Sequence, residues 1–150
     1  MKNYQSNVNK PLVDAVMLYI IAAHKGVPRR FTGDPYMVHP LTVAEAVWQY
    51  GTDYIIVALL HDVIEDTPIT LDGLKQEFGD KLTESTYDAI DRISQRSNES
   101  NEKYFKRVKP NKLSRTVKVA DMLHNLSDFH RFGKEVQIKK ITKQMLFLMV

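Results

Sequence analysis

The sequence predicts an all-α fold, a single-domain bundle of about seven or eight helices over residues 1–150. Apolar residues recur at helical spacing along most of the chain, and Gly and Pro separate the segments. No segment combines sustained alternation of apolar and polar residues with hairpin turns, which a β fold would need. A length of 150 residues suits one domain with a sizeable core and, at about 11 residues per helix, accommodates this number of helices.

The first helix is predicted over residues 11–24, because Pro11 suits a first turn and Gly26 follows the last apolar residue. The next segment, residues 26–40, is punctuated by Gly and Pro and is expected to form a loop. A second, short helix is predicted over residues 41–51, which end in a glycine that suits a helix C-terminus.

The third helix is predicted over residues 52–66, with Thr52 as its N-cap and Pro68 preventing its continuation. A fourth, over residues 70–79, begins with a threonine that can cap it and ends in a glycine. The remaining predicted helices cover residues 81–96, 111–133 and 135–150, with a polar break at residues 97–103.

Composition restricts the chemistry. The chain has no cysteine, which excludes disulfides and thiolate metal sites, so any metal must be held by nitrogen and oxygen ligands. The N-terminus is polar and lacks the apolar core of a signal peptide, and the apolar runs elsewhere are too short to span a bilayer. We therefore expect a cytoplasmic protein without a membrane partner. The apolar run at residues 145–150 is either a docked helix or a surface for oligomerisation.

Positive charge is concentrated in residues 103–118, which contain seven Lys or Arg and no acid. Such a run suits a polyanion, large or small, and a solvated helix face explains it about equally well. Nucleic-acid binding is the weakest interpretation, because only Tyr104 and Phe105 interleave with the charges and no helix-turn-helix pattern is present. The basic residues that could flank phosphate groups are Lys103, Lys106, Arg107, Lys109, Lys112 and Arg115.

The stretch ALLHDVIEDT, residues 58–67, places a histidine and three carboxylates directly after an apolar run. On a helix, His61 and Asp62 are about 100° apart, and Glu65 and Asp66 follow one turn later. Carboxylates this close repel one another unless a divalent cation or a cationic substrate group lies between them. An adjacent imidazole favours a transition metal over calcium or magnesium. The alternative is a set of solvated side chains.

Two further positions complete a possible metal site. His39 precedes Pro40 at a loop-to-helix junction, where the backbone is restricted. Asp121 interrupts an apolar helical face and needs a partner if buried, which Lys118 or Arg115 could also provide. The four candidate ligands form a set of two nitrogens and two oxygens that leaves positions open for water and substrate: His39, His61, Asp62 and Asp121.

Three motifs, AHKGVPRRFTGDPYMVHP, ALLHDVIEDT and VKVADMLHNLSD in that order, resemble those of the HD-domain phosphohydrolases. More narrowly, the chain resembles the alarmone hydrolase domains of the RelA/SpoT homologue family and the small alarmone hydrolases. The resemblance extends over roughly residues 12–130 and implies a single all-helical HD domain. The motifs that point to the alarmone hydrolases, and not to HD-domain proteins in general, are GDPYMVHP and the HDVIEDT extension.

The resemblance also implies an activity and a set of roles. Family members bind Mn(II) and release pyrophosphate from guanosine 3′,5′-bis(diphosphate), a nucleotide alarmone, and from its pentaphosphate relative. The metal ligands would be His39, His61, Asp62 and Asp121. Glu65 and Asp66 would orient and deprotonate the attacking water. Arg30 would pack on the guanine, and Asn125 would contact the ribose.

The sequence departs from the family at positions that bear on the substrate. The residue after the base-stacking arginine is usually basic, and here it is Phe31. The segment between the Glu-Asp pair and Asp121 is closer to that of generic HD nucleotide hydrolases. Two alternatives therefore stay open: an HD-domain hydrolase of another nucleotide, and a catalytically inactive domain that binds a nucleotide or metal. The metal could also be a divalent transition metal other than Mn(II).

Overall fold

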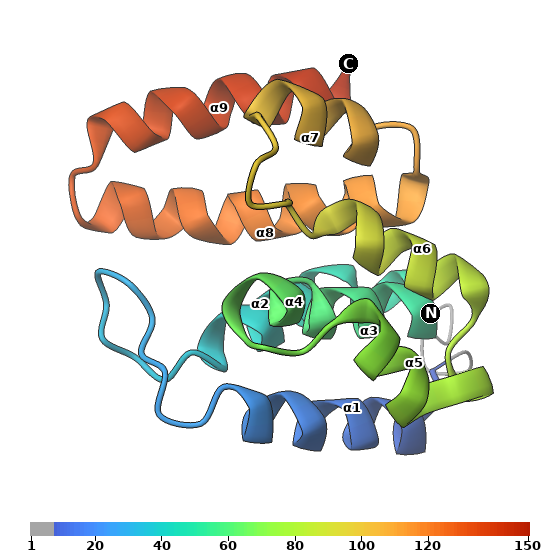
Figure 1. The fold of residues 1–150 in the computed structure, drawn as a ribbon. Coiled ribbons are helices and arrows are strands. Elements are labelled where there is room, and N and C mark those ends of the chain that lie inside the picture. Colours follow the sequence, from blue (N-terminus) through green and yellow to red (C-terminus); the bar gives the residue numbers. More distant parts are fainter. Residues whose placement is uncertain (1–7) are drawn as a thin grey trace, which may run out of the picture.

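A computed structural model describes residues 8–150 and consists of helices joined by loops (Figure 1). Within this range there are nine α-helices, two 3₁₀ turns, one isolated bridge between Pro28 and Pro35, and no strand. The α-helices are α1 (Lys10–Ala23), α2 (Val38–Val47), α3 (Thr52–Leu60), α4 (Val63–Asp66), α5 (Leu71–Phe78), α6 (Glu84–Ile93), α7 (Asn101–Val108), α8 (Lys112–Arg131) and α9 (Glu135–Met149), and the 3₁₀ turns are η1 (Trp48–Tyr50) and η2 (Gly79–Lys81). The predicted all-α class is confirmed.

The helix predicted over residues 52–66 is divided into α3 and α4 by a turn at His61 and Asp62. In an uninterrupted helix the Ala58 carbonyl would accept from the Asp62 amide. Instead it lies 2.6 Å from Nδ1 of the His61 ring. The predicted N-cap was also wrong: Thr52 is the first residue of α3, and the N-cap position is held by Gly51.

Helix α7 is another departure, because residues 101–103 were expected to lie in a polar break and no helix was predicted between that break and residue 111. Its N-cap is Ser100, whose side chain accepts a hydrogen bond from the Lys103 amide. Such a cap stabilises a helix by about 1 kcal/mol. Side-chain caps of the same kind start four other described helices, provided by Asn9 for α1, Thr70 for α5, Thr83 for α6 and Asn111 for α8.

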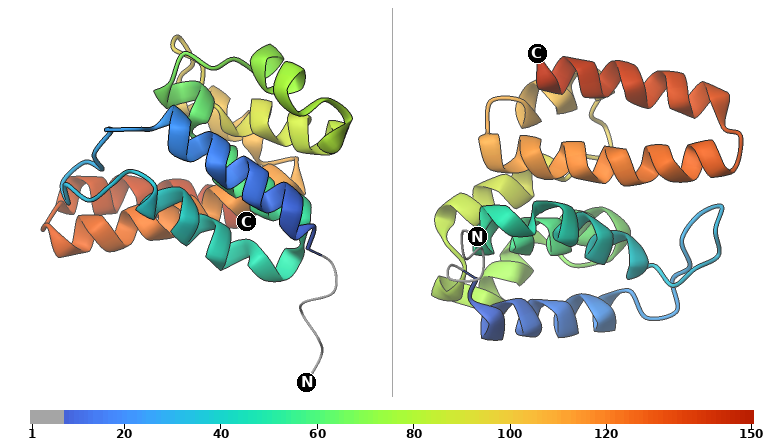
Figure 2. Two further views of the ribbon diagram at one scale, coloured as in Figure 1. Left: turned by 90° about the horizontal axis from the view of Figure 1, so that it is seen from below. Right: turned by 180° about the vertical axis from the view of Figure 1, so that it is seen from behind.

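The helices are stacked in layers, with α1 on one side, α2 to α4 in the middle, and α8 followed by α7 and α9 on the other side (Figures 1 and 2). Helix α8 contributes to two apolar clusters. Val117 packs in the cluster shared with α1, α2, α3, α5 and α6, whereas Met122 packs in the cluster shared with α7 and α9. Because α8 is packed between two cores, its polar residues in the first interface are buried next to α2 and α3.

The C-terminal apolar run is partly docked. Met145 and Leu148 are buried in the second cluster, whereas Leu146 and Met149 are largely exposed. Among the described helices, none has both the length and the apolar character required to cross a bilayer. The expected absence of a signal peptide concerns an N-terminal segment whose residues 1–7 lie outside the described range.

Candidate metal centre

The structure brings together the four side chains selected as candidate metal ligands. His39 lies in the first turn of α2, His61 and Asp62 form the turn between α3 and α4, and Asp121 lies in the middle of α8. Nε2 of His39 is 3.1 Å from Nε2 of His61 and 3.0 Å from Oδ1 of Asp121. Nε2 of His61 is 3.1 Å from Oδ2 of Asp62. The two imidazoles and the Asp121 carboxylate are almost fully buried, whereas Asp62 is partly exposed.

The chemistry of this donor set fits a divalent cation. Nδ1 of His61 donates to the Ala58 carbonyl, which leaves a lone pair on Nε2. That lone pair faces Nε2 of His39, and two neutral nitrogens at this distance repel unless a proton or cation lies between them. Ligand atoms of His39, His61 and Asp121 all lie within 4.8 Å of one another. Metal-binding histidines usually donate a hydrogen bond from their other ring nitrogen to a carbonyl or carboxylate, as His61 does here.

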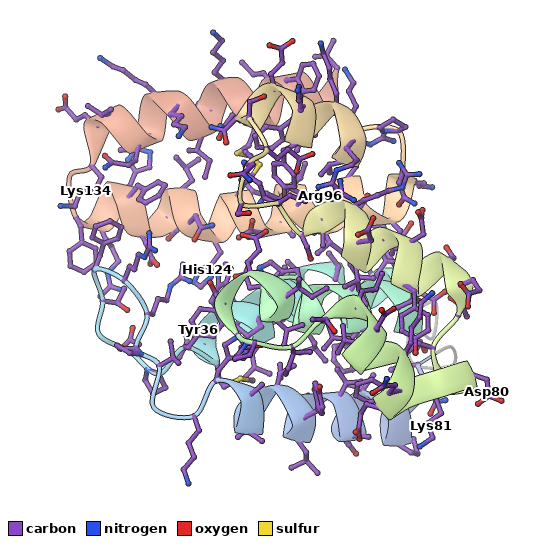
Figure 3. All side chains as sticks on the ribbon, in the orientation of Figure 1. Tyr36, Asp80, Lys81, Arg96, His124 and Lys134 are labelled. Carbon is purple, nitrogen blue, oxygen red and sulfur yellow. The ribbon has the colours of Figure 1, made fainter. Side chains whose placement is uncertain are left out.

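His124 provides the corresponding contact for His39. The Nδ1 atoms of the two rings are 2.8 Å apart, and His124 lies on the side of α8 that faces the middle layer (Figure 3). Burial lowers the pKa of His124, and the positive charge of Arg29 lowers it further. The neutral ring of His124 can accept the Nδ1 proton of His39, which leaves Nε2 of His39 free as a ligand.

Buried charges compensate one another around Asp121. Nζ of Lys118 lies 2.8 Å from Oδ2, the carboxylate oxygen opposite the one that faces the histidines. Burial alone would raise the pKa of Asp121, but Lys118 and the two histidines outweigh it and hold that pKa well below its usual value. Burial likewise opposes the charge on Lys118, but Asp121 and Tyr104 keep its pKa above the ordinary value. Asp121 therefore has both contacts considered from the sequence, an ion pair with Lys118 and the histidines of the candidate site.

Tyr36 binds the same oxygen of Asp62 that lies 3.1 Å from Nε2 of His61. Its hydroxyl donates a hydrogen bond to Oδ2 of Asp62, and its ring stacks on His24 with centroids 4.4 Å apart. Burial and the carboxylates of Asp62 and Asp66 raise the pKa of Tyr36, so the hydroxyl stays protonated and remains a donor. Tyr36 was not selected from the sequence, although it stands within the GDPYMVHP motif.

Glu65 and Asp66, the candidate residues for activating water, both line a pocket of about 590 Å³ that opens beside the candidate metal ligands. Oε1 of Glu65 accepts a hydrogen bond from the Gln95 amide at 2.6 Å. Burial raises the pKa of Glu65, the Gln95 contact lowers it, and Asp62 raises it again, so that the net pKa is raised. A raised carboxylate pKa brings a general base closer to neutral pH.

The two adjacent arginines of the first loop have different environments. Arg30, the candidate for stacking on the base, lies in the pocket wall with an exposed side chain. Arg29 is buried and was missed by the sequence analysis; its Nε donates to Oδ2 of Asp128 at 2.7 Å. The signal that could have identified it is Asp128, which follows Asp121 by two helical turns on an inward-facing side of α8.

Asn125, the candidate for the ribose contact, also lines the pocket and bonds at both ends of its amide. Its Oδ1 accepts from Nη2 of Arg29 at 2.9 Å, and its Nδ2 donates to Oδ1 of Asp121 at 2.7 Å. Its amide therefore connects the loop to Asp121 in this structure.

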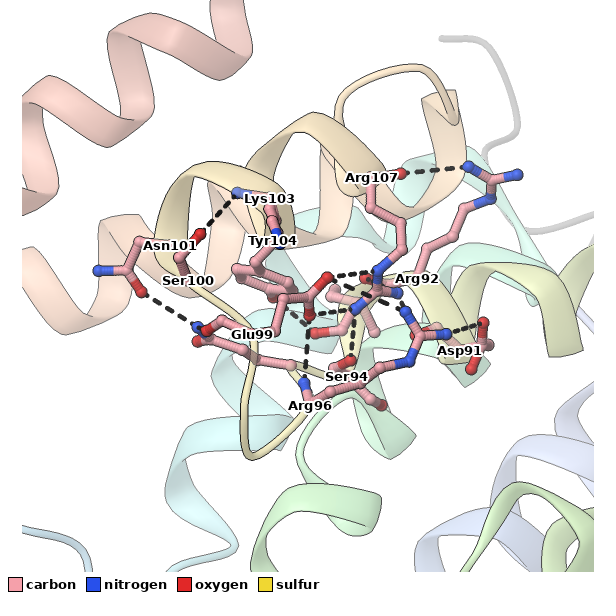
Figure 4. A network of polar contacts seen from close by, with 12 residues as sticks. Asp91, Arg92, Ser94, Arg96, Glu99, Ser100, Asn101, Lys103, Tyr104 and Arg107 are labelled. Atoms are coloured by element: carbon pink, nitrogen blue, oxygen red, sulfur yellow. Dashed lines mark hydrogen bonds and ion pairs between the residues drawn. The ribbon is translucent and has the colours of Figure 1, made fainter.

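The basic run has a structural role that the sequence did not indicate. The six residues proposed to flank phosphates are absent from the wall of the pocket, which contains Lys118 from the same run. The Arg107 guanidinium binds the Glu99 carboxylate at 2.7 and 2.9 Å and the carbonyls of Asp91, Arg92 and Ser94 (Figure 4). Arg107 thus fastens α7 to the C-terminus of α6, where unpaired helix carbonyls need donors.

Comparisons with known proteins match most of the chain to one family. The family model described as the HD domain matches residues 17–148. A protein of Mycobacterium leprae named "Probable GTP pyrophosphokinase" is 32% identical over 146 residues, which are 93% of this chain and 18% of that protein. A protein of Aquifex aeolicus named "Guanosine-3′,5′-bis(diphosphate) 3′-pyrophosphohydrolase" is 34% identical over 128 residues, which are 81% of this chain and 18% of that protein.

The fold is also similar to a solved structure described under the words "A metazoan ortholog of SpoT hydrolyzes ppGpp and plays a role in starvation responses". The TM-score is 0.70 at 22% sequence identity, and the match covers 89% of this chain and 85% of the other. The chain spans about a fifth of the length of the two curated relatives, so their complete activities concern much longer proteins. Since the family model covers most of the chain, from the middle of the first helix to the last helix, this protein belongs to the HD-domain family.

Proposed function

We propose that this chain is a Mn(II)-dependent phosphohydrolase that releases pyrophosphate from the 3′ position of guanosine 3′,5′-bis(diphosphate). The observation that carries the proposal is the convergence of two histidines and two aspartates beside a pocket that also holds Glu65 and Asp66. The name of the Aquifex aeolicus relative supports the choice of substrate. The proposed hydrolysis would be the same reaction with another divalent transition metal in place of Mn(II).

His39, His61, Asp62 and Asp121 would hold the metal. A divalent ion bound there would lower the pKa of a nearby water and neutralise phosphate charge, which is how such ions promote phosphoryl transfer. The absence of thiolate ligands and the mixture of imidazole and carboxylate suit manganese and related ions.

The chain's own residues account for proton transfer and binding. Glu65, whose pKa is raised, is placed in the pocket wall to accept a proton from water, and Asp66 lies beside it. The water oxygen forms a bond to the phosphorus attached to the ribose 3′ oxygen, and the bond from that phosphorus to the 3′ oxygen breaks. The 3′ oxygen takes up a proton, so that guanosine 5′-diphosphate and pyrophosphate are released.

Three positively charged side chains are available in the pocket wall for a polyanionic substrate. Arg30 has an exposed planar guanidinium that can stack on a base, which a lysine cannot do. Lys118 lies next to the candidate metal ligands and lines the pocket, with its charge paired to Asp121. Arg29 is already paired with Asp128 and contributes less net charge.

The test is incubation of the purified protein with guanosine 3′,5′-bis(diphosphate) and Mn(II), with the products separated by anion-exchange chromatography. Equimolar guanosine 5′-diphosphate and pyrophosphate are expected. Release of single phosphate groups, or no turnover, would contradict the proposed reaction. Omission of the metal and addition of a chelator serve as controls.

A second candidate is hydrolysis of a different nucleotide by the same site. It is favoured by Phe31, which lines the pocket at a position where the family usually has a basic residue. A panel of nucleoside mono-, di- and bis-phosphates with Mn(II), scored separately for phosphate and pyrophosphate, distinguishes the two. Tight nucleotide binding without turnover of any member would favour a non-catalytic binding domain.

A further inference from the structure

The loop of residues 27–36 is joined to α8 by a buried ion pair. Nε of Arg29 lies 2.7 Å from Oδ2 of Asp128, and the two side chains are only 8% and 9% exposed. The loop itself is a narrow turn, closed by a hydrogen bond from the Arg29 amide to the Asp34 carbonyl at 2.8 Å and by the bridge between Pro28 and Pro35. Removing one partner of such a pair leaves a buried charge without compensation, so the loop cannot leave α8 at low cost.

The same guanidinium reaches the metal ligands through one intermediate side chain. Nη2 of Arg29 donates to Oδ1 of Asn125 at 2.9 Å, and Nδ2 of Asn125 donates to Oδ1 of Asp121 at 2.7 Å. The acceptor in the second bond is the carboxylate oxygen that lies 3.0 Å from Nε2 of His39. Because the Asn125 amide has its oxygen fixed by Arg29, its nitrogen is directed toward Asp121.

A second contact joins the tip of the loop to the same end of α8. Phe31 has a left-handed backbone, with φ of 66°, which costs a non-glycine residue roughly 1 kcal/mol. Its ring packs edge-on against Phe129 with centroids 6.0 Å apart, and Nζ of Lys134 lies 5.0 Å from the ring centroid. Figure 3 shows Lys134 close to this loop. The loop is therefore fixed by an ion pair and by an aromatic contact that do not share residues.

We propose that Arg29 is a positioning residue for the metal ligand Asp121, acting through Asn125, and that its ion pair with Asp128 couples the loop over the pocket to the metal centre. This inference rests on the proposed metal site and goes beyond it, because it assigns a role to a residue outside the ligand set. It predicts that the loop conformation and metal binding are energetically coupled. Loss of the Arg29 contact then weakens metal binding, and bound metal stabilises the loop.

The test measures Mn(II) binding to the full chain by titration calorimetry with the metal alone, so that nucleotide turnover is not needed. Arg29→Gln is expected to weaken Mn(II) affinity about 3- to 10-fold, somewhat less than direct partners of metal ligands do. Asn125→Ala is expected to weaken it about 10-fold. In the double variant the effect should equal that of Asn125→Ala alone, because Arg29 acts through Asn125.

Arg107→Gln is the matched control. Arg107 forms a similar ion pair with Glu99, with a nitrogen-to-oxygen distance of 2.7 Å, and neither residue lines the pocket. It should lower the thermal midpoint and leave Mn(II) affinity unchanged. Should Arg29→Gln fail to fold, Arg29→Lys keeps the charge for Asp128 but cannot serve both partners at once, and a weakened affinity is again expected.

Three results would overturn the proposal: Mn(II) affinity of the Arg29 variants within about two-fold of the wild type, full additivity with Asn125→Ala, or no Mn(II) binding by the wild type. A wild-type protein that binds Mn(II) and shows the coupling, but hydrolyses no nucleotide, would contradict the proposed function and leave this inference standing.

Discussion

The Nδ1 atoms of His39 and His124 lie 2.8 Å apart, and the two rings stack with centroids separated by 5.0 Å. One of these nitrogens must donate to the other. We expect His39 to carry its proton on Nδ1 and the ring of His124 to accept it. Nε2 of His39 then presents its lone pair to His61 and Asp121, which is the tautomer that a metal ligand requires.

Replacement of His124 by Phe is therefore expected to weaken Mn(II) affinity by about 10- to 100-fold, because the ring stacking is kept but the acceptor for His39 is lost. Titration calorimetry with the metal alone measures the effect. His130→Phe, at an exposed position of the same helix, is the control and should bind Mn(II) as the wild type does. If His124→Phe binds Mn(II) as tightly as the wild type does, His124 is not the residue that orients the His39 ring.

Much of this centre follows from local chemical signals in the sequence. A histidine followed by acids after an apolar run, and an aspartate on an apolar helical face, identified residues that the fold places within hydrogen-bonding distance of one another. Asp121 also shows the limit of that reasoning. Its two interpretations, a salt bridge or a metal ligand, were treated as alternatives, yet its two oxygens face different partners.

The features that were missed depend on contacts between distant segments. Helix α7 has a polar sequence, and it is held by Tyr104 in the second core and by Arg107 on the carbonyls of α6. At the break after α3, the His61 side chain takes the Ala58 carbonyl that a continuous helix would use. No local signal distinguishes Arg29 from Arg30, because only the loop conformation decides which side chain meets Asp128.

The pair of Lys118 and Asp121 should contribute strongly to stability when no metal is present. Lys118→Met leaves the Asp121 carboxylate buried without its main positive partner, and we expect the free energy of unfolding to fall by about 3 kcal/mol. Urea denaturation in the presence of a chelator measures it. Added Mn(II) should restore part of the loss, because a cation at Oδ1 compensates the same carboxylate.

A double variant separates this charge effect from loss of packing. Lys118→Met combined with Asp121→Asn removes both charges and should be more stable than Lys118→Met alone in chelator, while binding no Mn(II). Asp121→Ala should abolish both metal binding and hydrolysis. If the double variant is the less stable one, packing of the lysine stem and not charge pairing is the main contribution of Lys118.

Glu65→Gln tests the assignment of the water-activating group. The amide keeps the size of the side chain and can still accept from the Gln95 amide, but it cannot take a proton. We expect turnover of the proposed substrate to fall by about 10²- to 10⁴-fold with Mn(II) affinity unchanged. The kcat, measured by assays quenched at fixed times, and the Mn(II) affinity, measured by titration calorimetry, should be determined on the same preparation. Parallel loss of both would instead identify Glu65 as a metal ligand.

The ion pair of Glu99 and Arg107 should make stability dependent on acid pH. Hydrogen bonds from Arg107 lower the pKa of Glu99 from 4.5 to about 2. A carboxyl group whose pKa is depressed in the folded state stabilises the protein above its unfolded pKa, and the contribution disappears as the pH falls toward the folded value. We expect wild type to exceed Glu99→Gln by about 2 kcal/mol in the free energy of unfolding at pH 7, and the difference to vanish between pH 4.5 and 2. Urea denaturation across this range measures it, with Glu102→Gln, which alters the exposed pair with Lys106, as a control that should change little. A difference that stays constant with pH would mean that the carboxylate charge is not what holds α7 to α6.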